Sequence, residues 1–213
     1  TKIRFTMIKN TLFFLITILS VLNAKINFSI NGDFSNFYAM KTIDNEVLNI
    51  PFRLLNLHST IYINNFELHH TYSVEYTKID DVWPINFNSN NFNDDIRELY
   101  GTYYFNIGEI SFGKKLFTLG SVDENSPIDH FNPYNYSYLL LGGTDKKSPI
   151  NALSFDLYLE NIKISGAFSP DHNTNNFPNT NSDFDLGTPN PPNWWEFLEK
   201  KGSEHESFLS FQI

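Results

Sequence analysis

The stretch Phe66-Glu-Leu-His-His-Thr-Tyr-Ser-Val-Glu-Tyr-Thr77 alternates between two kinds of side chain with a period of two residues. Its even positions are mainly aromatic or aliphatic, and its odd positions carry Glu, His and hydroxyl groups. Because successive side chains of a strand point to opposite faces of a sheet, the pattern predicts a β-strand with one apolar and one polar face.

The same alternation recurs on both sides of this stretch, with almost no helical pattern after residue 26. The preceding Asn64-Asn65 predicts a tight turn, which would place Thr60 opposite His69 and His58 opposite Thr71. The other alternating segments are Ile26–Phe34, Phe52–Asn64, Ile96–Ile107, Ile110–Leu116, Leu153–Leu159, Ile162–Phe168 and Phe208–Ile213.

The connections between these segments are alternately short and long. Short turns fall at Asn64-Asn65, near Ile107-Gly108 and at Glu160-Asn161, and the long connections lie near 39–50, 80–95, 121–149 and 171–205. Short periplasmic turns and long extracellular loops are typical of barrels that cross the outer membrane. The chain is therefore predicted to be all-β, as an antiparallel up-and-down transmembrane β-barrel. A secreted soluble carbohydrate-binding β-sandwich remains an alternative, because sandwiches also alternate.

Residues 1–24 have the features of a secretory signal peptide. Lys9 follows Met7, the expected start, and Thr11–Leu22 is a mostly apolar run too short to cross a bilayer as a helix. Residues 1–6 look like upstream sequence, and cleavage is expected after Ala24. Residues 25–213 are predicted to form about seven strands and part of an eighth, as the N-terminal portion of a larger barrel.

The composition excludes several classes of protein. The chain has no Cys, so neither a disulfide framework nor a Cys-based zinc site is available. Its net charge of −9 and the lack of a basic cluster argue against nucleic acid as a partner. With 21 Phe and 11 Tyr, the chain is too aromatic to be disordered. Only 18% of its residues are charged, as expected where half of the positions face lipid.

Residues 96–134 carry motifs that resemble a large family of Gram-negative outer-membrane barrels related to the alginate-export porin. The strand-pair motifs of that family, R-E-A/L-Y followed by G-[RK]-Q-x-x-x-W-G, match Arg97, Glu98, Tyr100, Gly113, Lys114 and Gly120. Its N-P loop motif matches Pro127, Asp129, Asn132 and Pro133. Two positions depart from the family pattern: Leu119 stands where Trp is usual, and Lys115 where Gln is common.

This resemblance implies a porin or channel in the outer membrane. Expected activities are passive passage of small polar solutes (sugars, organic acids or cations) or export of a polysaccharide, without a cofactor. The expected partners are outer-membrane lipid, a small polar solute and the barrel-assembly machinery. A non-conducting structural or adhesive barrel remains an alternative. An enzyme is not expected, because no nucleophile elbow, phosphate-binding loop or well-placed Ser/His pair is found.

Parity along the strands also predicts which side chains line the pore. The candidates are Asn56, His58, Glu67, His69, Glu75, Glu98, Tyr100, Tyr104, Lys115, Asp156, Tyr158 and Lys163. Imidazole and carboxylate groups at His58, Glu67 and His69 are a possible metal set, although hydrogen bonding along the wall is the favoured interpretation. The many acids favour cations or neutral polar solutes.

The long connection near 121–149 supplies candidates for a constriction. They are Asp123, Glu124, Pro127, Asp129, Asn132 and Pro133. The family resemblance implies that this loop folds inward and narrows the pore, and its prolines stiffen the backbone. Its clustered oxygen ligands also suit calcium, but an ordinary polar loop is favoured, and no metal is predicted.

Overall fold

A computed structural model describes residues 25–48, 50–77, 91–118, 131–138, 141–171, 174–178 and 206–212. These residues form one eight-stranded antiparallel sheet in which the strands follow one another in sequence order. The all-β, up-and-down antiparallel prediction is therefore confirmed. The strands are β1 (Ile26–Phe34), β2 (Phe52–Ile63), β3 (Phe66–Tyr76), β4 (Phe92–Phe105), β5 (Gly108–Lys115), β6 (Ile150–Leu159), β7 (Ile162–Ser169) and β8 (Glu206–Gln212).

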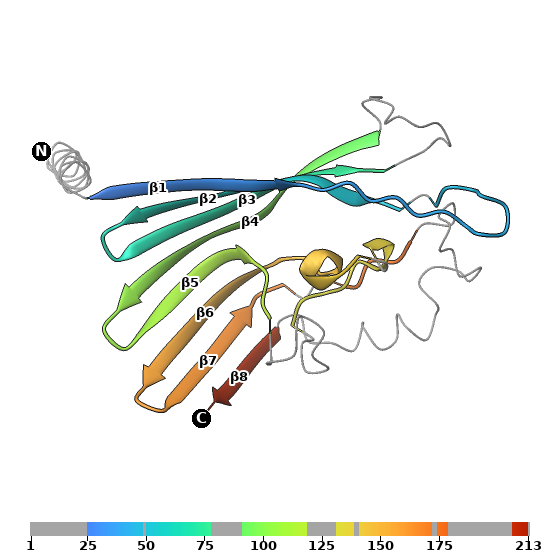
Figure 1. Ribbon diagram of the computed structural model, residues 1–213. Helices are drawn as coiled ribbons and strands as arrows, with labels where there is room; N and C mark the ends of the chain where they lie inside the picture. The colour runs from blue at the N-terminus through green and yellow to red at the C-terminus, as the bar shows by residue number, and fades with distance from the viewer. Residues whose placement is uncertain are drawn as a thin grey trace, which may run out of the picture.

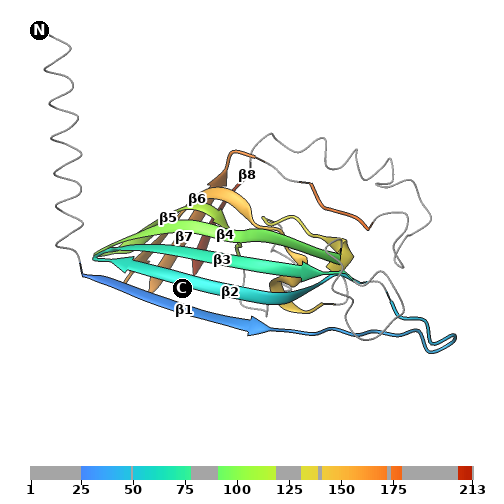
Figure 2. The same ribbon diagram turned by 90° about the horizontal axis from the view of Figure 1, so that it is seen from above.

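The sheet is strongly curved, and its two ends differ (Figures 1 and 2). The tight turns between β2 and β3, β4 and β5, and β6 and β7 lie together at the turn end of the sheet. The opposite end, here called the loop end, holds two 3-10 turns, η2 (Tyr136–Tyr138) and η3 (Gly143–Lys146). Within the described ranges, no ladder joins β1 to β8, so the sheet is open there.

The strand register follows the predicted parity except at two β-bulges, at Leu54 in β2 and at Arg97 in β4. His58 lies opposite Thr71, and Thr60 lies opposite His69, as the Asn64-Asn65 turn requires. Asn64 has a φ of 53° in this turn, a conformation that Asn tolerates better than most residues. One face of the sheet consequently collects hydroxyl, amide and charged groups, and the other collects aliphatic and aromatic groups.

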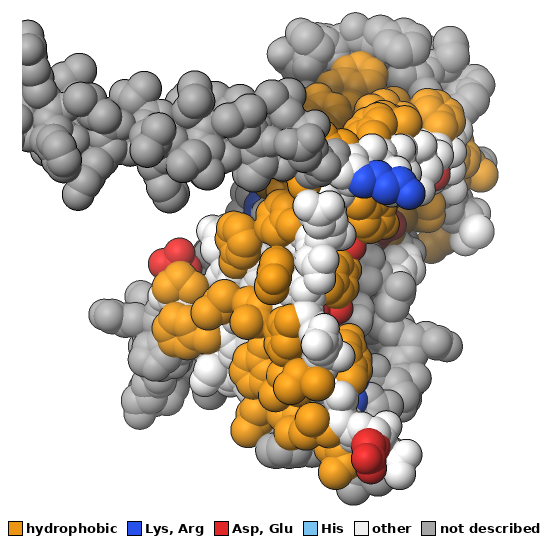
Figure 3. Space-filling view, turned by 90° about the vertical axis from the view of Figure 1, so that its left-hand side faces the viewer, with side chains coloured by type: hydrophobic (Ala, Val, Ile, Leu, Met, Phe, Trp, Pro, Cys, Tyr) orange, Lys and Arg blue, Asp and Glu red, His pale blue; other side chains and the backbone are white. Residues whose placement is uncertain are grey.

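The apolar face is exposed. Phe28 is 62% exposed, Phe112 56% and Leu209 60%. In a soluble protein, side chains of this kind usually form the buried core. In Figure 3 the hydrophobic side chains form a broad patch with charged groups mainly at its edges. The buried side chains of the strands include small polar groups instead, namely Thr71, Ser73, Thr102 and Ser111.

Two small hydrophobic clusters do form in the structure. Phe117, Phe131, Ile150, Ala152 and Ala167 make the first, with Phe208 packed against it. Phe52, Leu54 and Tyr76 make the second, which Phe37, Phe92 and Leu141 complete. Because both clusters contain a residue from 131–149, they attach this segment to the sheet.

The structure corrects the predicted connections. β4 begins at Phe92, so the loop expected near 80–95 ends earlier than predicted. The polar run that follows Phe92 reads as a loop, yet it pairs with β3, and the Phe92 ring packs on Tyr76 with centroids 5.0 Å apart. The connection near 39–50 contains a bridge between Met40 and Val47. The predicted signal peptide lies outside the described residues.

Candidate functional site

The candidate site is the polar face of the sheet together with a segment that packs on its loop end, which is described at 131–138 and 141–149 and is called the 131–149 segment. The strand register brings all twelve predicted wall residues to this one face. They are Asn56, His58, Glu67, His69, Glu75, Glu98, Tyr100, Tyr104, Lys115, Asp156, Tyr158 and Lys163. That these side chains line a pore remains a prediction.

A hydrogen-bonded network occupies the middle of the polar face. The buried Thr71 hydroxyl lies 3.1 Å from His58 Nδ1 and 3.2 Å from His69 Nε2. Thr71 also donates to Glu98, which accepts a hydrogen bond from the Leu116 backbone N–H at 2.9 Å. The His69 ring stacks on Tyr100. These groups satisfy one another, as polar groups on a half-buried wall must.

The network does not assemble the metal set considered for this face. Glu67 accepts a hydrogen bond from the Tyr104 hydroxyl at 2.5 Å, while His58 and His69 meet at Thr71. In the described part of the chain, no three His, Asp or Glu side chains are grouped so that they could hold a metal ion. Wall hydrogen bonding is therefore the interpretation that fits the geometry.

Charged groups near the turn end are paired but remain in contact with solvent. Lys163 Nζ lies 3.3 Å from Asp156 Oδ2, and both side chains are partly exposed. At the far end of β5, away from the turns, Lys115 Nζ lies 4.8 Å from the centre of the Tyr100 ring. Tyr158 receives the Lys163 ammonium in the same way, at 5.4 Å. Solvent screening makes each of these contacts weak.

The 131–149 segment is attached to the wall through Asn132 and Phe131. Asn132 is 1% exposed, and its Oδ1 accepts from the Phe117 N–H at 2.8 Å while its Nδ2 donates to the Ser148 carbonyl. The Pro133 carbonyl accepts from the Ser148 N–H. Asn132 therefore ties the segment to the residue Phe117 beyond β5, whereas the Pro133 bond joins the two ends of the segment itself. The other constriction candidates, Asp123, Glu124, Pro127 and Asp129, lie outside the described residues.

Two buried arginines bind the same segment through hydrogen bonds and ion pairs. Arg53 Nη1 donates to Asp145 Oδ1 at 2.7 Å, and Arg97 Nη1 approaches the same oxygen at 3.3 Å. Arg97 Nη2 also donates to the backbone carbonyls of Thr144 at 2.5 Å and Lys147 at 3.4 Å. Asp145 itself is 41% exposed, so the buried partners are the two arginines, and a buried guanidinium left without an acceptor costs more than an unpaired cation on the surface.

Parity missed both arginines because each lies beside a β-bulge. The register of β2 on β3 skips Leu54, and that of β3 on β4 skips Arg97. An extra residue in one strand shifts parity on one side of the bulge, so side chains expected on the apolar face reach the polar one. The adjacent Arg97-Glu98 was a detectable signal, because an arginine is costly on a lipid-facing position.

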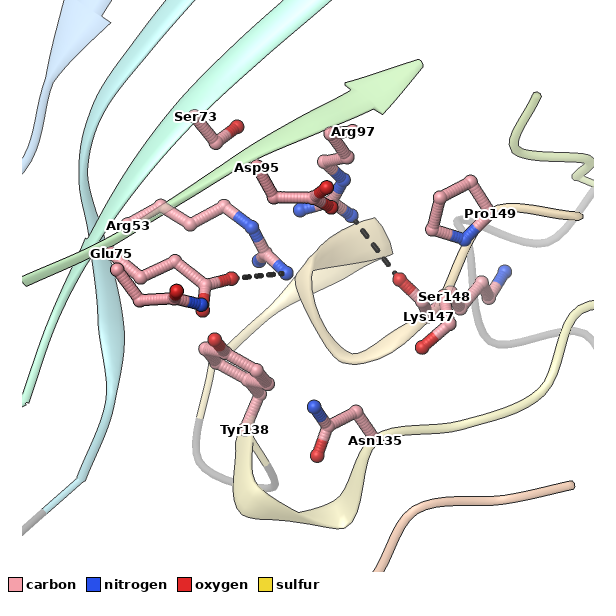
Figure 4. A pocket seen from close by; sticks show the side chains of 11 residues that line it. Arg53, Ser73, Glu75, Asp95, Arg97, Asn135, Tyr138, Lys147, Ser148 and Pro149 are labelled. Atoms are coloured by element: carbon pink, nitrogen blue, oxygen red, sulfur yellow. Dashed lines mark hydrogen bonds and ion pairs between the residues drawn. The ribbon is translucent and has the colours of Figure 1, made fainter. Parts of the chain in front are cut away.

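A cavity of about 200 Å³ lies between the wall and the segment (Figure 4). Its lining is Arg53, Ser73, Glu75, Asn93, Asp95, Arg97, Asn135, Tyr138, Lys147, Ser148 and Pro149. The Tyr138 ring covers the Arg53 guanidinium, with Cζ 4.6 Å from the ring centre. Burial, the charge of Glu75 and a hydrogen bond to Glu75 raise the pKa of Tyr138, so its hydroxyl stays protonated.

One donor of this cavity is unsatisfied. Arg53 Nε is buried and has no hydrogen-bond partner, and the Arg53 side chain as a whole is only 7% exposed. Arg53 Nη2 lies 3.8 Å from Glu75 Oε1, which is too long for a hydrogen bond. A buried donor without an acceptor typically costs about 1–3 kcal/mol, so a protein that keeps one usually gains something from it.

Comparisons with known proteins do not identify a family or a function for this chain. No protein-family model, curated protein or solved structure matches the chain. Among the residues that the structure describes, there is no helix with the length and apolar character needed to cross a membrane. The resemblance to the alginate-export porins therefore remains a prediction.

Proposed function

We propose that the chain forms part of an outer-membrane β-barrel porin that lets small polar solutes pass. In this proposal the apolar face of the sheet meets lipid, the polar face lines the pore, and the 131–149 segment narrows it. The tight turns lie in the periplasm and the loop end faces outside. Lipid and the barrel-assembly machinery are the expected macromolecular partners.

The observation that carries the proposal is the inverted distribution of side chains. Ile30, Phe112 and Leu153 are more than half exposed on one face, whereas Ser73 and Thr102 are almost fully buried on the other. Each large apolar side chain left in water forgoes about 1.5–3 kcal/mol of transfer free energy. A bilayer removes that penalty, and a curved sheet keeps the polar face away from lipid.

A soluble carbohydrate-binding sandwich fits this arrangement less well. Such a fold covers its apolar face with a second sheet and exposes its polar face. Here, the segment that packs on the sheet covers the polar face instead, through Asn132, Arg53 and Arg97. A constriction made by an inward loop also favours small solutes over a polysaccharide chain.

Membrane insertion is tested by cell fractionation and gel migration of the full chain. The proposal expects recovery with the outer membrane and a band that migrates faster before boiling than after it. Recovery in the soluble periplasm, with migration unaffected by heat, would contradict the membrane proposal and favour the sandwich.

Passage of solutes is tested in planar lipid bilayers with the purified full-length protein. Discrete conductance steps and sugar-induced swelling of proteoliposomes are expected. A correctly inserted barrel that gives neither conductance nor swelling would defeat the transport proposal and leave a structural or adhesive role.

A further inference from the structure

We propose that the cavity between the wall and the 131–149 segment binds a small organic carboxylate, so that organic acids are among the solutes the protein selects. This inference rests on the proposed porin function for its biological meaning, but the binding itself does not require conduction. The site is called the arginine cavity and comprises Arg53, Glu75, Arg97, Tyr138 and Lys147.

The arginines already hold one carboxylate that belongs to the chain. Asp145 Oδ1 accepts from Arg53 Nη1 and lies within ion-pair distance of Arg97 Nη1. The Nη2 group of Arg97 already donates hydrogen bonds to two backbone carbonyls. The pair is therefore arranged to share a carboxylate oxygen, and Arg97 has little capacity for another ligand.

The opposite side of the Arg53 guanidinium makes no hydrogen bond, although Glu75 lies within ion-pair distance of it. Arg53 Nε has no partner, and Nη2 lies 3.8 Å from Glu75. These two groups form the side of arginine that pairs with a carboxylate through two parallel hydrogen bonds. Glu75 does not take this place, because it is held by a hydrogen bond with the Tyr138 hydroxyl.

Burial and size also suit a small anion. The cavity is lined by the cations Arg53, Arg97 and Lys147 and the acids Glu75 and Asp95, and Asp145 pairs with both arginines, so an anion would be held by the donors of Arg53 rather than by an excess of positive charge. All three cationic residues are less than a tenth exposed, so solvent screens them poorly. A volume of about 200 Å³ admits a solute of a few carbon atoms but excludes a polysaccharide.

Tyr138 packs against the residue that carries the unpaired donor. Its ring lies over the Arg53 guanidinium, as Figure 4 shows, and Nε is sealed from solvent. The ring covers the face of the guanidinium and not its in-plane edge, so a carboxylate meets Nη2 first and reaches Nε only when the groups packed around Nε shift. Binding is expected to reposition Tyr138, which gives the site a signature besides affinity.

Isothermal titration calorimetry of the full chain, refolded in detergent at low salt, tests the proposal with succinate as the probe. Saturable binding is expected for succinate but not for succinamide, its neutral analogue of similar size. Arg53→Lys keeps the positive charge but loses the two-donor edge, so binding should weaken about tenfold or more. Asp145→Asn removes the competing internal carboxylate and should bind succinate at least as tightly as the unaltered protein.

Lys41→Gln provides the matched control. Lys41 pairs with Glu46 on an exposed loop outside the cavity, so its loss removes one cation without altering the site. Unchanged affinity is expected. The proposal is overturned if succinate gives no saturable heat, if succinamide or sulfate binds equally well, or if Arg53→Lys and Lys41→Gln have the same effect.

A second readout guards against a variant that misfolds. Heat-modifiable migration must persist in Arg53→Lys, and the fluorescence of a probe placed beside Tyr138 should change with succinate only in the unaltered protein. Conductance without succinate binding would reject the carboxylate site and leave the porin proposal intact. Succinate binding without conductance would do the reverse.

Discussion

The turn end and the loop end of the sheet use charge in opposite ways. Near the turns, Lys163 and Asp156 pair across two strands while remaining partly exposed. At the loop end, Arg53 and Arg97 are buried beneath the segment that they hold. At the loop end the cations are thus shielded from solvent although their shared partner Asp145 is 41% exposed, whereas at the turn end both members of the pair are partly exposed.

The difference follows from how regular the strands are. Near the turn end, each residue of one strand pairs with one residue of the next, so the alternation of faces is preserved. The polar side chains there stand on a wall that solvent reaches. At the loop end, bulges at Leu54 and Arg97 interrupt that parity and turn side chains toward the loop. The cavity therefore lies where the strand pairing is irregular.

Exchanging one cation at each end is the strongest test of this comparison. Arg97→Met removes the charged hydrogen bonds to the Thr144 and Lys147 carbonyls, which should together cost about 3–5 kcal/mol of unfolding free energy, while the lost pair with the 41% exposed Asp145 adds little. Lys163→Met should cost less than about 1 kcal/mol, because solvent screens its pair. Urea unfolding in detergent measures both values. Equal losses would show that the two ends do not differ.

Charge on either face of one strand distinguishes lipid from water as the surroundings. Leu153→Arg places a cation on the apolar face, where Leu153 is 54% exposed, and should destabilise a membrane barrel by about 2–4 kcal/mol if it sits near the bilayer centre. A water-exposed position would lose no more than about 0.5 kcal/mol.

Ser154→Arg is the matched control for this experiment, since Ser154 follows Leu153 and faces the polar side. Its cost should stay below about 1 kcal/mol, with the main effect on ion selectivity. Equilibrium unfolding from lipid vesicles reports both. If Leu153→Arg proved as mild as Ser154→Arg, the apolar face would not lie in lipid.

The sequence predicts the turn end better than the loop end for a physical reason. Alternation and turn chemistry are local, so Phe66–Tyr76 and the Asn64-Asn65 turn suffice to set strand, face and register. The twelve wall residues could be assigned to one face because the assignment requires only the alternation of side chains along each strand.

The arginine cavity required information that lies far apart in the sequence. Arg53 and Asp145 are separated by 92 positions and meet only after the 131–149 segment has folded onto the wall. The bulges that turn the arginines inward follow from strand twist and packing rather than from any residue type. Asn132 was predicted as part of a loop, but its bonds to Phe117 and Ser148 depend on tertiary contacts.

Two glycines probe how tightly the wall and the loop constrain their backbones. Gly113 in β5 has a φ of 130°, and an added Cβ would collide with the Leu99 carbonyl oxygen. Gly113→Ala should therefore cost about 2 kcal/mol. Gly142 in the segment meets no atom within 4 Å of an added Cβ, so Gly142→Ala should be neutral or slightly stabilising. Thermal unfolding compares the two variants, and a harmless Gly113→Ala would refute the packing of β4 on β5.

The smallest expected effect concerns the turns themselves. Glu160 adopts a φ of 44° between β6 and β7, a left-handed conformation that costs a residue with a Cβ about 1–2 kcal/mol. Glu160→Gly relieves this strain but adds flexibility to the unfolded chain, so a net gain of about 0.5–1 kcal/mol is expected. Asn64→Gly is the matched control, because Asn already tolerates its φ of 53° and the change should be near zero. Urea unfolding in detergent resolves the two variants. A loss of stability in Glu160→Gly would mean that the Glu160 side chain supports the turn through contacts that outweigh its strain, and the turn end would then be less simple than its alternation indicates.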